Sequence, residues 1–148
     1  MIRATSITHS HDAAADTVTL SYNDRHRRRM AMVCDKGLEF LLDLRHATEL
    51  RDGDALVLED GRTVRVKAAP EDLMEARCTD ALHLMRIAWH IGNRHLPCEI
   101  HESRLLLRWD SVIADMLEKL GAQVTRFTAP FNPEGGAYDT AHGGHAHG

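Results

Sequence analysis

The chain has 148 residues, of which 43% are hydrophobic, 27% charged and 5% aromatic, and its formal net charge is −4 with neutral histidines. Such values are typical of a globular protein with one domain or two small ones. The acidic balance argues against a nucleic-acid partner. No apolar run approaches the roughly 18 residues that a membrane-spanning helix needs. An apolar leader is not visible at the N-terminus, so we expect a cytoplasmic protein.

The three cysteines, Cys34, Cys78 and Cys98, are far apart and form no C-x-x-C pair. An odd number of dispersed cysteines is typical of buried free thiols rather than of disulfides or a thiolate metal site.

The first half of the chain shows short apolar runs separated by turn signals. Strands are predicted at residues 17–20, 30–34, 39–44, 55–58 and 63–66. Asp60-Gly61 between the last two is a hairpin signal. This pattern predicts a small antiparallel β domain over residues 1–69. The basic run 25–29 fits a solvated strand edge better than a docking surface for an acidic partner.

After Pro70 the apolar period becomes helical in two places. Asp80 or Thr79 can cap the start of a first helix, and Gly92 is predicted to end it in the left-handed conformation. Asp110 can cap a second helix that ends at Gly121. The apolar positions of the first helix are Ala81, Leu84, Met85, Ala88 and Ile91. Strands are expected at residues 72–78, 97–101, 104–108 and 123–127. This order predicts a ferredoxin-like (βαββαβ) domain over residues 70–131, and hence an α+β protein.

Residues 132–148 have the composition of a linker followed by a His-rich end. His142, His145 and His147 are separated only by Gly and Ala, which cannot build a core. Neutral imidazoles bind borderline-soft divalent metals, so we expect a flexible tail that handles metal. A purification tag or an inert polar end is the other interpretation, but a tag is normally an unbroken His run.

Among the eleven histidines, His95 is in a distinctive place. It lies between Gly92 and Pro97, so its imidazole is presented from a defined helix exit. His83 and His90 are interpreted as surface or dimer-interface residues, and His101 is ambiguous. From the residues alone, His95 is either a metal ligand or an ordinary hydrogen-bonded histidine.

Residues 91–97, Ile-Gly-Asn-Arg-His-Leu-Pro, resemble the helix-exit motif of urease accessory proteins of the UreE family. The resemblance covers about residues 30–131. Its other segments are 39–44, 50–54, 64–71, 110–117 and 120–122. It implies a β-rich domain that is peptide- or partner-binding-like, followed by a ferredoxin-like domain that binds metal and dimerises, with His95 of both subunits at the two-fold axis.

The resemblance also implies that Ni(II) is a cargo delivered to apo-urease, together with an accessory GTPase and scaffold proteins. Zn(II) or Cu(II) should bind in vitro as well, because imidazole does not discriminate strongly among these ions. Many members carry His where this chain has Ser111, and some carry His at Trp109. Secondary binding is therefore expected at His101 or in the tail.

Two other functions are compatible with a chain of this kind, a metalloenzyme and a protein-binding module. A metalloenzyme is disfavoured, because the chain has no H-E-x-x-H, no Ser-His-Asp set and no Gly-rich phosphate loop; we expect no enzymatic activity. A protein-binding co-chaperone module of the urease maturation complex, with incidental metal binding, stays open.

Overall fold

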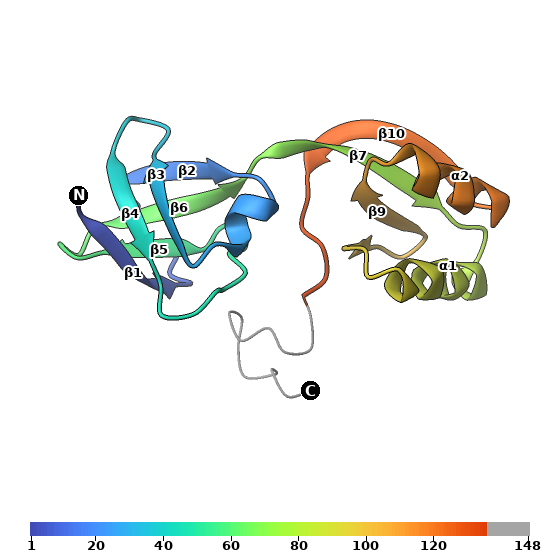
Figure 1. Cartoon of the computed structure of the whole chain (residues 1–148), viewed down its shortest axis with the longest axis horizontal. Helices are drawn as coiled ribbons and strands as arrows, with labels where there is room; N and C mark the ends of the chain where they lie inside the picture. The colour runs from blue at the N-terminus through green and yellow to red at the C-terminus, as the bar shows by residue number, and fades with distance from the viewer. Residues whose placement is uncertain (136–148) are drawn as a thin grey trace. The chain divides into compact units, whose positions relative to one another are not determined.

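The structure is a computed structural model that describes residues 1–135. The described backbone divides into two compact units, Met1–Ala69 and Pro70–Glu134 (Figure 1). Together they contain two β-sheets and two α-helices, so the protein is a mixed α+β protein.

The first unit contains one six-stranded sheet with the order β2-β6-β5-β1-β4-β3. Its elements are β1 (Arg3–Thr8), β2 (Asp16–Leu20), the 3₁₀ helix η1 (Asn23–His26), β3 (Arg29–Val33), β4 (Glu39–Asp43), β5 (Ala55–Leu58) and β6 (Thr63–Ala68). The predicted hairpin is present, since Gly61 has a φ of 88° in the turn and β5 pairs with β6 antiparallel. Leu56, Leu58, Val64 and Val66 point from this hairpin into the core.

The prediction of an antiparallel first domain is wrong, because its sheet is mixed. β1 pairs with β4 in parallel, and β2 pairs with β6 in parallel. Strand β1 itself is missing from the sequence prediction. Turn residues specify pairing only between neighbouring strands, whereas both parallel pairs join strands that are far apart in the sequence.

The second unit follows the order β7 (Pro70–Arg77), α1 (Ala81–Asn93), β8 (Glu99–Ile100), β9 (Arg104–Arg108), α2 (Ser111–Lys119) and β10 (Gln123–Pro130). Its four strands form an antiparallel sheet in the order β10-β7-β9-β8. Both helices contribute to one core cluster with alternate residues of β7 and β9. The fully or nearly fully buried members from these elements are Met74, Ala76, Ile87, Ile91, Leu105, Leu107, Ala114 and Leu117.

Both predicted N-caps are confirmed. The Asp80 carboxylate accepts a hydrogen bond from the backbone N–H of His83 at 2.8 Å. The Asp110 carboxylate accepts from Val112 and Ile113 at 2.9 and 3.0 Å. Each cap satisfies N–H groups that the first helical turn leaves without a partner, which is why the helices begin at these residues.

Candidate metal-binding site

Helix α1 ends in a hydrogen-bonded turn that fixes the backbone of His95. The N–H of His95 donates to the Gly92 carbonyl at 3.0 Å, and the N–H of Leu96 donates to the Ile91 carbonyl at 3.3 Å. This pair of bonds is the Schellman helix end, in which the residue after the C-cap takes a left-handed backbone. His95 holds that position with a φ of 58°, and within residues 1–135 no other non-glycine residue has a positive φ.

The prediction that Gly92 is the left-handed stop is wrong. Helix α1 continues through Gly92 to Asn93, and the left-handed residue comes three positions after the glycine. The side chain of Leu96 packs against the core cluster that contains Ile91. An apolar contact of this kind accompanies the Schellman end, so core packing rather than the nearest glycine decides where the turn closes.

Helix α2 provides an internal comparison, because it ends with the same pair of bonds. Gly121 donates to the Glu118 carbonyl at 2.9 Å and Ala122 donates to the Leu117 carbonyl at 3.0 Å. Here the left-handed position is a glycine with a φ of 94°, as the sequence predicts. A residue with a side chain costs about 1 kcal/mol or more in this conformation. The chain therefore places a histidine where a glycine would be cheaper, which points to a use for the imidazole.

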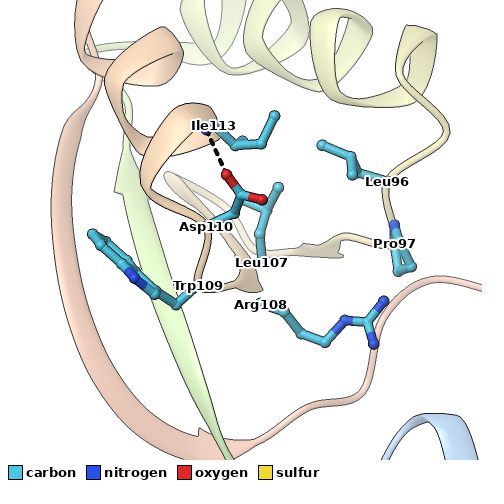
Figure 2. Close-up of a pocket in the computed structure, with 7 residues that line it drawn as sticks. All are labelled: Leu96, Pro97, Leu107, Arg108, Trp109, Asp110 and Ile113. Carbon is cyan, nitrogen blue, oxygen red and sulfur yellow. Dashed lines mark hydrogen bonds between the residues drawn. The ribbon is translucent and has the colours of Figure 1, made fainter.

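The residues directly after His95 form one wall of a cavity of about 330 Å³. Figure 2 shows Leu96 and Pro97 on one side, with Asp110 and Ile113 from the start of α2 facing them. The side chain of His95 is exposed, whereas Leu96 and Pro97 are half-buried. The site therefore presents an exposed imidazole on an anchored backbone.

The exposed face of α1 carries large apolar side chains. Leu82, Met85 and Trp89 are 53%, 61% and 64% exposed and follow one another at helical spacing. Of the apolar positions that the sequence predicts at helical spacing, Ile91 lies in the core together with Ile87, whereas Met85 lies on the exposed face. The sequence contains a signal for this exposed apolar face, because Leu82, Met85 and Trp89 stand at positions i, i+3 and i+7 and so form a second apolar stripe on the helix. We call Leu82, Met85 and Trp89 the α1 stripe.

His83 connects the two helices of the second unit. Its Nδ1 accepts from the Thr79 N–H at 3.0 Å, and its Nε2 lies 2.9 Å from the Leu120 carbonyl oxygen. A neutral ring with the proton on Nε2 satisfies both contacts. Both ring nitrogens of the half-buried His83 thus contact backbone groups of the same chain, and its predicted place at the surface or at a dimer interface stays a prediction.

Other histidines pair with carboxylates, and the two shortest of these contacts are made by His101 and His9. His101 Nε2 lies 2.6 Å from Glu99 Oε2, and His9 Nδ1 lies 2.9 Å from Asp54 Oδ1. Neither pair contains a third metal-binding side chain, and among residues 1–135 no group of three His, Cys, Asp or Glu side chains could hold an ion. The predicted ligands His142, His145 and His147 lie outside the described residues.

Trp109 and Ser111, where the resemblance implies histidine in some family members, can be placed in the structure. The Arg126 guanidinium lies 4.4 Å from the centre of the Trp109 ring, a cation–π contact. Arg126 also binds Asp72 through two nitrogens at 2.8 and 3.1 Å. Ser111 is an exposed residue at the start of α2.

All three cysteines are free thiols, as predicted. Burial, reinforced by neighbouring carboxylates, raises the pKa of Cys34 to about 11 and that of Cys98 to about 12. Cys34 and Cys78 are buried, and Cys98 is half-buried. Thiols with such pKa values are protonated at neutral pH and are poor metal ligands.

None of the helices in the described part of the chain combines the length and apolarity needed to cross a membrane. The sequence matches the family description "UreE urease accessory protein, N-terminal domain" over residues 2–69 and "UreE urease accessory protein, C-terminal domain" over residues 71–148.

Similar proteins include two that bear the name "Urease accessory protein UreE". The one from Chelativorans sp. (strain BNC1) is 60% identical over 148 residues, which cover 99% of this chain and 94% of the relative. The one from Rhodopseudomonas palustris (strain HaA2) is 58% identical over 150 residues, which cover 99% of this chain and 70% of the relative. These relatives are named as accessory proteins rather than enzymes. The chain belongs to the UreE family of urease accessory proteins.

Proposed function

We propose that this chain is a nickel metallochaperone, which binds Ni(II) as a cargo and delivers it for the assembly and activation of urease. The observation that carries the proposal is the exposed imidazole of His95, fixed in a left-handed backbone position that favours glycine. Family membership supports the same function, because the relatives are named urease accessory proteins.

The metal site requires more ligands than one described chain supplies near His95. We propose a homodimer through the second unit, with one His95 from each subunit bound to the ion. The α1 stripe supports this arrangement, because an exposed apolar patch on a surface helix is typical of an interaction site. It also lies on the helix that presents His95.

Two imidazoles leave coordination positions open, and we propose that His142, His145 and His147 fill them. A site with exchangeable ligands releases its ion more readily than a closed four-ligand structural site. Selectivity for nickel then depends on metal availability and partners, because Zn(II) and Cu(II) also bind imidazole. The partners in this proposal are the accessory GTPase, the scaffold proteins and apo-urease, in the cytoplasm.

Each part of the chain has its own role in this function. Residues 70–131 are interpreted as the ferredoxin-like domain for metal binding and dimerisation, which the strand order β10-β7-β9-β8 supports. Residues 1–69 are interpreted as a partner-binding domain, and residues 132–148 as the metal-binding tail.

The second candidate is a protein-binding co-chaperone module whose metal binding is incidental. A cavity of about 590 Å³ in the first unit favours this function. It is lined by residues of β5, β6 and the turn between them, by Thr8 at the end of β1 and by loop residues 10 and 12–15, and it is large enough for side chains of a partner segment.

Nickel titration separates the two candidates. Wild type, His95→Asn and a chain ending at Ala137 are titrated with Ni(II), and the oligomeric mass is measured in parallel. The nickel-delivery proposal expects a dimer, loss of the shared site in His95→Asn and lower stoichiometry in the shortened chain. A monomer that takes up no Ni(II) at neutral pH contradicts it. Unchanged nickel uptake in both variants favours the co-chaperone module.

A further inference from the structure

The segment after β10 is attached to the edge strand β8. The Asn132 N–H donates to Glu99 Oε1 at 2.9 Å, and the Glu134 N–H donates to the Cys98 carbonyl at 2.9 Å. Phe131 and Pro133, which alternate with these two donors, are buried. The composition of residues 132–134 predicts a linker, whereas in the structure these residues belong to the second unit.

Glu99 is the side chain at the centre of this attachment. One carboxylate oxygen accepts from Asn132 and the other lies 2.6 Å from His101 Nε2. The Glu99 side chain is only 18% exposed. A carboxylate with both oxygens engaged and little water around it is held in one orientation, so it can fix the backbone of the segment that it binds.

The attachment lies close to His95 along the chain. Cys98 follows His95 by three residues, which span at most about 11 Å. His142 follows Glu134 by eight residues, which can span up to about 28 Å. Covalent geometry alone therefore allows a tail that starts at Glu134 to bring an imidazole to an ion at His95.

We propose that Glu99 is a positioning residue, which fixes the start of the tail beside His95 and so raises the local concentration of tail imidazoles at the metal. This inference rests on the proposed function. It extends that function by naming the residue that makes the tail and the core act as one site. The other explanation is purely structural, in which residues 131–134 only cover the edge of β8.

The expected effect follows from chain length. If the attachment is lost, the tail starts at Pro130 and twelve residues rather than eight separate it from His142. Effective concentration falls roughly as the −3/2 power of linker length, so Ni(II) affinity should fall about twofold or more. Nickel affinity is measured by competition with a chelator, in the full chain and in a chain ending at Ala137. Amide hydrogen exchange of Asn132 and Glu134 is followed in parallel.

Four variants make the test specific. Glu99→Ala removes the acceptor, and Asn132→Pro removes the donor without altering β8. Glu99→Gln keeps an acceptor oxygen for Asn132 and should retain most of the affinity. Glu102→Ala removes a nearby exposed carboxylate as a control for charge. We expect faster exchange at residues 132 and 134 and weaker nickel binding in the first two variants, only when the tail is present.

The outcomes separate this inference from the proposed function. Two outcomes overturn the role of Glu99 but leave the proposed function intact. In the first, Glu99→Ala and Asn132→Pro lose the same nickel affinity with and without the tail. In the second, neither variant loses nickel affinity, although removal of the tail weakens nickel binding. If removal of the tail leaves nickel binding unchanged, the proposed tail ligands are wrong, and the role of Glu99 is overturned with them.

Discussion

The backbone N–H of His95 donates to the carbonyl of Gly92 at 3.0 Å, and this bond places a histidine in the left-handed position of a helix end. The equivalent position at the end of α2 is Gly121. The two helix ends differ in the residue at this position but share their hydrogen bonds. His95 therefore carries a conformational free-energy cost that glycine would avoid, and it does so at the candidate metal site.

Replacing His95 by glycine should stabilise the fold and remove nickel binding at the shared site. Glycine adopts a φ of 58° without steric cost, although it gains more entropy in the unfolded chain. The net gain in the free energy of unfolding should be about 0.5–1 kcal/mol. Urea denaturation and nickel titration measure the two effects. His95→Asn is the control, since asparagine tolerates this backbone and lacks the imidazole. A His95→Gly protein that is less stable than wild type contradicts the assigned strain.

A charge in the α1 stripe should separate the dimer without unfolding the subunit. Met85 is 61% exposed in the single chain, so Met85→Glu leaves the core intact but places a carboxylate in the proposed interface. We expect at least a tenfold weaker dimer, measured by sedimentation equilibrium. Val112→Glu is the matched control, because Val112 is 75% exposed and lies on α2 outside the stripe. Equal dimerisation of Met85→Glu and wild type would place the interface elsewhere.

Nickel affinity should fall as the pH is lowered from about 7 to 5.5. Imidazole binds metal only when neutral, and the ordinary pKa of histidine is near 6.5. Competition titrations at several pH values measure the slope. The tail-truncated chain should show a shallower dependence, because fewer imidazoles take part. Constant affinity over this range is incompatible with histidine ligands.

The stability of the second unit should depend on the ionisation of Glu75. Its hydrogen bond from Arg104 at 2.7 Å, together with the charges of Arg77 and Arg104, holds its pKa below the ordinary value of 4.5. The folded pKa is the lower one, so the stabilisation is present above pH 4.5 and is lost as the pH falls through the folded pKa. Glu75→Gln should cost about 0.5–1 kcal/mol at neutral pH. The cost should shrink as the pH falls through the folded pKa of Glu75, which urea unfolding at pH 7 and at a series of pH values below 4.5 can show. A cost that persists in acid would have another cause, and Glu102→Gln serves as a surface control.

The start of α2 should depend on the Asp110 cap. Asp110→Ala leaves the N–H groups of Val112 and Ile113 without their side-chain acceptor and should destabilise the protein by about 1 kcal/mol. Asp110→Asn keeps an acceptor and should lose little. Thermal unfolding compares the two variants. Similar losses in both would show that the charge, rather than the cap, provides the stability.

The sequence by itself determined the features whose interactions span only a few residues. Asp80 and Asp110 begin the two helices, Gly121 ends α2 and Asp60-Gly61 turns a hairpin, because each acts on backbone groups within a few positions. His95 could also be singled out from its place in a helix-exit motif, but not its left-handed backbone, since that depends on the packing of Leu96.

Only the tertiary structure decided the features that join distant parts of the chain. The parallel pairs β1–β4 and β2–β6 have no local signal, because the partner strands are separated by other elements. The exposure of Met85 depends on which helix face the sheet covers. The hydrogen bond from Asn132 to Glu99 joins residues 33 positions apart. Local patterns record backbone preferences, whereas these contacts depend on which surfaces pack together when the whole chain folds.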